Sequence, residues 1–333
     1  MGSGLLSLRI GQDALTATGR LGLALYGADV AAADGQTAAV RMPLLPDGGG
    51  IATAWLGEGP VVSGRHGQLH YCHNADYLFG CVSLREQDFT PSADTSALQQ
   101  ASELIYILLF EVLTKTGFPC LLRCWNYLPS INHDGGGLER YRQFNIGRQD
   151  AFIAAGQAWL DGAPSACALG TAEGELLLYF LAGHVAPVPI ENPRQTSAYR
   201  YPQQYGPRSP TFSRASVLRA PAQTVLFISG TAAIVGHASM HPGDVLAQTR
   251  ETLANIEALL ESSAEALGKR LRLPDLCLKV FMRHPGDLPV VMDVLAAHGA
   301  DPARSFYLQA DVCRAELLVE IEAFGFSPGA GND

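Results

Sequence analysis

Three carboxylates crowd onto one face of the stretch "DVCRAELLVEIEAFG" (311–325), near the end of the 333-residue chain. Glu316, Glu320 and Glu322 occupy even-numbered positions, and apolar residues occupy the odd-numbered positions from 317 to 323. A period of two predicts a strand with one buried apolar face. The acidic face would ordinarily point to water. If it is covered instead, a desolvated carboxyl keeps its proton near neutral pH and can act as a general acid.

A second group of polar side chains lies in residues 187–220, a proline-rich segment that is much longer than an ordinary connection. Tyrosines and arginines alternate in it, among them Tyr199, Arg200, Tyr205 and Arg208. Tyrosine combines an apolar ring with a hydroxyl, and arginine binds carboxylates through paired hydrogen bonds. This composition fits either a lid or binding loop for an anionic ligand or a structural strap across the two halves of the chain.

A third basic group lies in "GLERYRQFNIGRQDAF" (137–152). Arg140 and Arg142 are expected in surface ion pairs. Arg148 follows a glycine and shares a helical face with Phe152, so we expect it to point inward.

Metal ligands are suggested by only one cluster, His66, His70, Cys72 and His73 in "HGQLHYCHNADY". Imidazole and thiolate ligands could suit zinc. No second Cys/His pair stands at a matching spacing, so we predict no metal site. The seven cysteines form no framework spacing, which indicates reduced thiols in a cytoplasmic protein.

The elements that carry these groups form a repeat, which reads as strand, helix, strand, helix, strand in both halves. The expected ranges are 76–84, 94–117, 120–132, 137–160 and 175–183 in the first copy, and 224–236, 244–268, 276–285, 288–299 and 316–325 in the second.

The closing strands of the two copies match almost letter for letter, as "GELLLYFLA" and "AELLVEIEA". Asp94 and Asp244 stand at the start of the corresponding helices. Tyr179 in the first copy stands where Glu320 stands in the second, on a face that reads as covered. By analogy we expect the Glu320 face to be covered too.

The repeat predicts an α+β protein in which two units, each a mixed sheet with two helices on one face, are fused in one chain. We expect an N-terminal unit at 1–186, with extra sheet before residue 65, and a C-terminal unit at 221–326. A connecting segment at 187–220 would join them, and a flexible tail would follow at 327–333.

Composition excludes several classes of function. The net charge of −9 and the lack of a Lys/Arg-rich run argue against nucleic-acid binding. No apolar run approaches the roughly 18 residues of a membrane span, and the N-terminus lacks the basic start and apolar core of a signal peptide.

Several segments resemble known families. "SGTAAIVGH", "PARSFYL" and "LLVEIEAF" are similar to the RidA (YjgF) superfamily, whose units have a chorismate-mutase-like fold. In that superfamily an arginine before the last strand binds a carboxylate, and a glutamate of the closing strand handles water and protons. Arg304 and Glu320 occupy those positions. "RCWNYLPSIN", "RQTSAYRYPQQYGPRSPTFSRA" and "ADVCRAELLVEIEAFG" more closely resemble the chorismatases, and this likeness spans about 65–326.

The chorismatase resemblance implies cleavage of chorismate, a dicarboxylate with an enolpyruvyl ether, and release of pyruvate without a cofactor. Protonation of the ether's methylene carbon would begin the reaction, which assigns Glu320 as the general acid. The substrate's carboxylates need arginines, and its ring needs positioning groups. The candidates are Arg148, Arg208, Arg304 and Arg200, with Tyr199, Tyr205 and Thr231.

The family's branches differ in product. A cysteine seven residues before the catalytic glutamate and a glycine in the "SGT" motif mark the 3-hydroxybenzoate branch, and alanine at both positions marks the hydrolytic branch. Cys313 and Gly230 therefore imply 3-hydroxybenzoate, with the substrate's ring hydroxyl replacing water as the attacking group and an arene oxide preceding aromatisation. Cys313 could also act by shape alone, as a small core residue.

Three alternatives remain open: a hydrolytic chorismatase that forms a dihydroxycyclohexadiene carboxylic acid, a RidA-like enamine or imine deaminase, and a non-catalytic module that binds an aromatic acid. Release of pyruvate from chorismate separates the chorismatases from the other two. RidA proteins are trimers, whereas a fused pair of units could be a monomer, so either state is open.

Overall fold

The computed structural model describes residues 4–32, 36–156 and 162–329, and it contains one fold twice. The strands of the first copy are β5 (Val62–His66), β6 (Leu69–His73), β7 (Tyr77–Leu84), β8 (Cys120–Pro129), β9 (Ser165–Thr171) and β10 (Leu176–Gly183). Those of the second copy are β11 (Val188–Ile190), β12 (Ala215–Arg219), β13 (Gln223–Ala232), β16 (Leu276–Met282), β17 (Ser305–Gln309) and β18 (Val319–Pro328). The helices are α2 (Ala97–Thr116) and α3 (Arg140–Ala154) in the first copy, and α4 (Val245–Leu267) and α5 (Leu288–Ala297) in the second.

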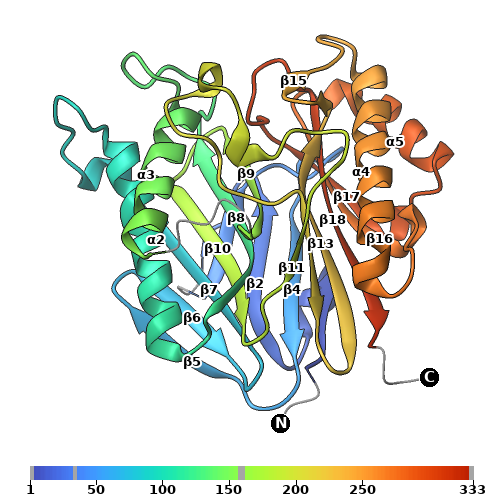
Figure 1. Ribbon diagram of the computed structural model, residues 1–333, viewed down its shortest axis with the longest axis horizontal. Coiled ribbons are helices and arrows are strands. Elements are labelled where there is room, and N and C mark those ends of the chain that lie inside the picture. Colours follow the sequence, from blue (N-terminus) through green and yellow to red (C-terminus); the bar gives the residue numbers. More distant parts are fainter. Residues whose placement is uncertain (1–3, 33–35, 157–161, 330–333) are drawn as a thin grey trace.

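Both copies have the same sheet topology. The strand order is β5-β6-β7-β10-β8-β9 in the first and β11-β12-β13-β18-β16-β17 in the second. In each, the closing strand is antiparallel to both of its neighbours, and the last two strands are parallel. The helices of the two copies lie on opposite outer sides, and the sheets face each other between them (Figure 1). The predicted α+β fold, with two helices on one face of each mixed sheet, is confirmed.

An N-terminal sheet fills the space between the inner faces. Its elements are β1 (Leu6–Ile10), α1 (Gln12–Thr16), β2 (Arg20–Gly27), β3 (Thr37–Arg41) and β4 (Ile51–Gly57), with strand order β1-β4-β2-β3. The ring of Trp55 lies 5.9 Å from that of Trp125 in the first copy and 5.4 Å from that of Phe324 in the second. The extra sheet expected beside the first copy therefore packs against both.

Local sequence explains where the two long helices begin and end. The Ser96 side chain accepts a hydrogen bond from the Gln99 amide at 3.1 Å, and Asp244 accepts one from the Ala247 amide at 2.9 Å. Both act as N-caps. Gly117 and Gly268 end the two helices with φ of 74° and 73°, in the left-handed region that favours glycine. Asp244 was identified correctly from the sequence, but Ser96, not Asp94, caps α2.

Helix α2 is long and apolar enough to span a membrane by length and composition alone, and half of that segment is buried inside the protein. Its buried residues, among them Ile105 and Leu109, form one core with Leu178 and Phe180 of β10. A core helix of this kind meets the same length criterion as a membrane span.

Several expected boundaries are corrected by strand pairing. Each copy gains an edge strand before its closing strand, β9 or β17. The ends of the expected connecting segment are strands β11 and β12, which continue the second sheet beyond β13. Between them, residues 191–214 are irregular apart from two short 3-10 turns, Ala198–Arg200 and Gln203–Tyr205. We call residues 191–214 the strap. The closing strand extends to Pro328, because Ser327 and Pro328 pair with Thr224 and Gln223. Residues 157–160 of the expected second helix and 330–333 of the expected tail lie outside the described residues.

Candidate active site

A cavity of about 410 Å³ lies where the start of α3, the strap and the inner face of the second sheet meet. The strap thus forms one wall of a cavity, as the binding-loop interpretation requires. The lining residues come from 139–142, 201–214, 230–234 and 313–320, and they are Glu139, Tyr141, Arg142, Tyr201, Gln204, Tyr205, Pro210, Phe212, Arg214, Gly230, Ala232, Ile234, Cys313, Arg314, Ala315, Glu316 and Glu320.

Glu320 is the buried acid of this cavity, with 3% of its surface exposed. It lies on β18, where it pairs with Ala232 on one side and Phe281 on the other. No hydrogen bond reaches its carboxyl from any described residue, so no hydrogen-bond donor stabilises the ionised form. Burial raises the pKa of Glu320 to about 8, the nearby carboxylate of Glu322 raises it further, and Arg123 and Arg214 oppose the rise. The acid is therefore mostly protonated at neutral pH.

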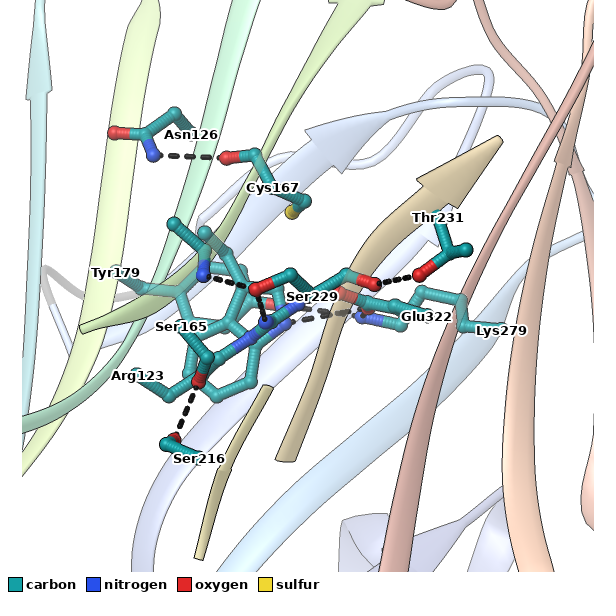
Figure 2. Close-up of polar contacts among 12 residues, drawn as sticks. Arg123, Asn126, Ser165, Cys167, Tyr179, Ser216, Ser229, Thr231, Lys279 and Glu322 are labelled. Carbon is teal, nitrogen blue, oxygen red and sulfur yellow. Dashed lines mark hydrogen bonds and ion pairs between the residues drawn. The ribbon is translucent and has the colours of Figure 1, made fainter. Parts of the chain in front are cut away.

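Glu322, two positions along the same strand face, has the opposite environment. Its carboxylate forms ion pairs with Arg123, at 2.6 Å, and with Lys279, and it accepts a hydrogen bond from the Trp125 indole at 3.2 Å (Figure 2). Burial disfavours ionisation of Glu322, but Lys279 and Arg123 outweigh it and hold its pKa below the usual range. The acidic face of the closing strand is thus covered, as expected, and carries one neutral and one ionised carboxyl. Glu316 alone is exposed.

Gly230 makes room for the acid. A Cβ at this position would collide with Oε1 of Glu320 and would lie 3.2 Å from Cβ of Cys167. The absence of a side chain at Gly230 therefore fixes how Glu320 enters the cavity. Cys313, also in the wall, has a thiol whose pKa is raised to about 12, first by burial and then by Glu320. This thiol stays protonated, which favours a role by shape over a nucleophilic one.

Two arginines of the cavity wall have donors that no described group accepts. Arg214 is buried, and its Nη2 donates to Thr196 O at 2.8 Å and to the Tyr201 hydroxyl at 2.7 Å, while its Nε has no partner. Arg314 lies 4.0 Å above the Tyr205 ring and donates to His237 O at 2.9 Å, while its Nη2 has no partner. Buried unpaired guanidinium donors are costly, and an anionic ligand in the cavity would satisfy them.

Arg283 holds the loop that carries Cys313 and Arg314 through several hydrogen bonds. Arg283 forms an ion pair with Asp311 and donates to the carbonyl oxygens of Val312, Arg314 and Leu317 at 3.2, 3.0 and 3.0 Å. These bonds hold the loop in one shape beside Glu320.

Tyr141 faces the acid from the first copy. Tyr141, Cys313 and Glu320 line the same cavity. Burial raises the pKa of the Tyr141 phenol far above the usual value, with further contributions from Cys313 and Glu320. Arg142 beside it pairs with Glu139 at 3.2 Å.

Most of the arginines expected from the sequence lie elsewhere. Arg208 is exposed and pairs with Asp150 at 3.3 Å. Arg200 is exposed and lies over the Tyr199 ring at 5.6 Å. Neither arginine, nor Tyr199, belongs to the cavity lining. The strap turns these side chains outward because its inner side is occupied by Tyr201, Tyr205 and other lining residues.

Arg148 and Arg304 also lie outside the lining. Arg148 is buried, as its helical face predicts, but its guanidinium lies 5.0 Å over Tyr106 and 5.4 Å over Phe152, in the core between α2 and α3. Arg304 precedes β17, with Nη2 3.6 Å from Sγ of Cys277.

Arg304 is far from the acid along the sheet. Cys277 pairs with Phe324, which is four residues beyond Glu320 on β18, or about 13 Å along the strand. Arg304, which occupies the carboxylate-binding position expected from the RidA resemblance, therefore does not reach this cavity.

Among the remaining candidates, Tyr205 lines the cavity and its hydroxyl lies 3.1 Å from Nδ1 of His237. Thr231 is buried next to Gly230, and its hydroxyl donates to Ser229 O at 2.8 Å, outside the lining. The structure thus brings together Glu320, Gly230, Cys313 and Tyr205.

The sequence reading missed Tyr141, Arg214 and Arg314. Arg214 and Arg314 lie within segments that resembled the family, "SPTFSRA" and "ADVCRAEL", but no periodicity marks which of several arginines faces inward.

The suggested zinc cluster belongs to the β5–β6 hairpin. There His66 pairs with Glu111 at 2.8 Å, and His73 bonds the Asn74 carbonyl at 3.0 Å. Across residues 4–32, 36–156 and 162–329, no three His, Cys, Asp or Glu side chains gather as a metal site would need.

Known proteins resemble this chain over most of its length. A family model described as "Chorismatase FkbO/Hyg5-like, N-terminal" matches residues 53–182. A protein of Streptomyces rapamycinicus named chorismatase is 40% identical over 284 residues, which cover 82% of this chain and 81% of that protein. A 3-hydroxybenzoate synthase of Streptomyces hygroscopicus is 34% identical over 285 residues, which cover 82% of this chain and 80% of that protein.

The similarity extends to solved structures. A crystal structure of a chorismatase matches 96% of this chain and 98% of its own length, with a TM-score of 0.84 at 33% identity. Single-unit Rid-family structures match a smaller part. One from Yersinia pestis covers 42% of this chain, with a TM-score of 0.32 at 24% identity.

Proposed function

The chain belongs to the chorismatase family, and from this premise we propose that it converts chorismate into 3-hydroxybenzoate and pyruvate. The observation that carries the proposal is a buried carboxyl, Glu320, which keeps its proton at neutral pH and faces a cavity with three arginines, two of which have unpaired donors. A dicarboxylate ether that must be protonated on carbon requires this combination. The relative named 3-hydroxybenzoate synthase supports the choice of product.

Glu320 starts the reaction by giving its proton to the methylene carbon of the enolpyruvyl group. The ether side chain becomes an oxocarbenium ion, and the carboxyl becomes a carboxylate. General acid catalysis of this kind is most efficient when the acid's pKa lies close to the working pH, and a pKa of about 8 satisfies that condition.

The second stage separates pyruvate from the ring. The neighbouring ring hydroxyl attacks the ring carbon that holds the ether oxygen and gives its own proton to the Glu320 carboxylate. The bond between that carbon and the ether oxygen breaks, and pyruvate leaves with its new methyl hydrogen. The resulting arene oxide takes the proton back from Glu320 onto its oxygen as it opens, and the ring then loses a proton from carbon to the Glu320 carboxylate and becomes aromatic. No water is consumed, and the acid returns to its starting state.

Arg214 and Arg314 are the arginines that we assign to the substrate's carboxylates, in place of Arg148, Arg200, Arg208 and Arg304. Arg148 also has unpaired Nε and Nη2 donors, but Arg214 and Arg314 line the cavity and Arg148 does not. Unpaired donors in the cavity wall support the assignment, because arginine–carboxylate hydrogen bonds are charge-assisted. Tyr141 and Tyr205 line the same cavity and would position the ring. The assignment requires no cofactor.

Gly230 and Cys313 favour the intramolecular route over hydrolysis. With glycine at 230, Glu320 can lie close against β13, and the cavity is wider by one methyl group at that point. A hydrolytic chorismatase, which releases a diene diol, is the second candidate, because two similar relatives carry the broader name chorismatase. A cytoplasmic location, supported by seven free cysteines, and a monomeric or trimeric state belong to the proposal as well.

The test is an incubation of the purified protein with chorismate in D₂O. Pyruvate is measured with a coupled lactate dehydrogenase assay, and ring products are separated by chromatography. We expect equal amounts of pyruvate and 3-hydroxybenzoate, with one deuterium in the pyruvate methyl group. Pyruvate accompanied by a diene diol would replace the product assignment with the hydrolytic one. No pyruvate would refute the proposed function and make enamine hydrolysis the next assay.

A further inference from the structure

One buried anion is shared between two buried cations that come from different copies. Arg123 of β8 and Lys279 of β16 stand at corresponding places in the two sheets, since Arg123 pairs with Leu181 of β10 and Lys279 pairs with Glu322 of β18. Both side chains bind Glu322 (Figure 2). A structural interface would need only one cation for one carboxylate, so the second cation calls for a reason.

The cluster is sealed from water and has a fixed shape. The side chains of Arg123 and Glu322 are 0% exposed and that of Lys279 is 3% exposed. Lys279 also donates to the Tyr26 hydroxyl at 2.7 Å and to the Tyr179 hydroxyl at 3.3 Å. Burial lowers the pKa of Lys279, and Glu322 and Tyr26 more than reverse this effect, so its pKa is raised. Lys279 therefore stays a cation at neutral pH, and the pair keeps Glu322 ionised.

Glu320 feels this fixed charge. Both carboxyls point to the inner face of β18, two residues apart, which separates their Cα atoms by about 7 Å. The other titratable or charged groups around Glu320 come from several elements. They are Arg123 of β8, Cys167 of β9, Arg214 next to β12, Cys313, Arg314 and Glu316 of the segment before β18, Glu139, Tyr141 and Arg142 at the start of α3, and Tyr201 and Tyr205 of the strap.

We propose that Glu322, held ionised by one cation from each copy, is a positioning residue for charge, whose negative charge keeps the proton on Glu320 at neutral pH. Its effect on the reaction rests on the proposed function, but its effect on Glu320 does not. After Glu320 donates its proton, the same charge makes the resulting carboxylate a stronger base for the ring proton. Glu322 is not among the residues that line the cavity, so we assign its effect on the reaction to its charge beside Glu320.

The distance sets the size of the effect. Two unit charges about 7 Å apart at an effective dielectric of about 20 interact strongly enough to shift a pKa by about one to two units. Replacing Glu322 by glutamine removes this interaction and leaves Arg123 and Lys279 unneutralised, which adds to the shift in the same direction.

The experiment is an infrared titration of the ligand-free protein. The carbonyl band of a protonated carboxylic acid is followed from pH 5 to pH 10, and the band of Glu320 is identified by its loss in Glu320→Gln. We expect the midpoint for Glu320 to fall by at least one pH unit in Glu322→Gln. With chorismate, the alkaline limb of kcat for pyruvate release should move down by the same amount.

Two further variants keep the test decisive if Glu322→Gln does not fold. The double variant Lys279→Met/Glu322→Gln replaces the buried pair by neutral groups, and it should also lower the midpoint. Lys279→Met keeps the anion, so its midpoint should stay at or above that of the wild type. A merely structural role predicts weaker stability with an unchanged midpoint in all three variants.

An unchanged midpoint in either glutamine variant that folds, or a lowered midpoint in Lys279→Met, would overturn the inference. If the wild type releases no pyruvate from chorismate, the proposed function fails on its own. The infrared titration still decides the inference in that case.

Discussion

The two copies share one fold but not one chemistry. Their closing strands occupy the same place in their sheets, yet Tyr179 and Leu181 in the first copy correspond to Glu320 and Glu322 in the second. The first copy instead contributes Arg123, which reaches across to Glu322. The two copies therefore share one scaffold, and only the second carries the acidic pair Glu320 and Glu322.

Each copy also has a cavity beside its closing strand. The cavity of the first copy, of about 600 Å³, is lined by Cys81, Leu177 and Glu175 among others, and Glu175 is the counterpart of Glu316. Its arginine Arg41 is already paired with Glu173 at 2.8 Å. Tyr179, where the acid would be, lies in a buried aromatic cluster instead. Space next to a sheet is thus common to both copies. The second copy is distinguished by a buried acid in a cavity whose wall contains arginines with unpaired donors.

The largest effect should come from position 320, where the closing strands of the two copies differ. Glu320→Gln keeps the shape but has no proton to give to carbon, so we expect kcat for pyruvate release to fall by about 10²–10⁴-fold. Glu175→Gln, on the closing strand of the first copy, is the matched control and should retain wild-type kcat. Equal losses in both variants would mean that the two cavities are not functionally different.

Next in size are the arginines of the second copy's cavity. Arg314→Gln removes a charged donor, and hydrogen bonds to charged groups contribute about 1.5–3 kcal/mol. KM for chorismate should therefore rise about 10–100-fold, with a smaller change in kcat. Arg208→Gln, which removes an exposed arginine of the strap, should change KM less than about threefold. A larger rise in KM for Arg208→Gln than for Arg314→Gln would instead support Arg208, which was predicted from the sequence, as the arginine that binds a carboxylate.

Substitution of Gly230 should change the reaction rate less than the substitutions above, but it should change the ratio of products. A Cβ in Gly230→Ala collides with Glu320 and forces the acid to move. We expect part of the flux to shift from 3-hydroxybenzoate to the diene diol, as measured by chromatography. Cys313→Ser keeps the size of the side chain, so an unaltered product ratio would indicate that Cys313 acts by shape. A loss of 3-hydroxybenzoate in that variant would argue for the thiol itself.

The last expected effect concerns the pH dependence of stability and does not involve the reaction. The pKa of Glu320 is raised to about 8 in the folded protein, above its ordinary value, so its contribution to stability is present below about pH 4.5 and is lost as the pH rises to 8. The slope is at most about 1.4 kcal/mol per pH unit. Urea unfolding between pH 5 and pH 8.5 should show this loss in the wild type and a flatter profile in Glu320→Gln. Parallel profiles would show that Glu320 is already ionised at neutral pH.

The contribution of Glu322 to stability depends on pH in the opposite direction. Its pKa is lowered in the folded protein, so its contribution is present above the ordinary glutamate range and is lost as the pH falls through the folded value. The two carboxyls, two residues apart on one strand, therefore destabilise the protein at opposite ends of the pH scale.

Much of the fold could be predicted from local pattern. The period of two around Ile321 indicated a strand whose odd positions are buried, and helical spacing with glycine after the last turn indicated α2 and α4. The repeat itself came from matching closing strands. The edge strands β9 and β17 were missed because short strands at a sheet edge leave only a weak alternation in the sequence.

Local pattern also predicted the buried acid, Glu320, but it did not predict which arginines line the cavity. Glu320 belongs to a strand whose opposite face must be covered, and its counterpart Tyr179 already indicated burial. The strap contains several arginines with no period, so the path of an irregular chain decides that Arg214 points inward and Arg208 outward.

By itself, then, the sequence determined the duplicated fold, the strand face that carries Glu320, and the residues Gly230 and Cys313 beside it. Only the tertiary structure decided which side chains share a cavity with that acid. Alternation along a strand reports which face is buried, because neighbouring residues share one backbone geometry. The cavity joins residues 139–142 to residues 313–320, and Glu322 is held from both sheets. Contacts between such distant segments depend on how the two copies pack, which no local pattern records.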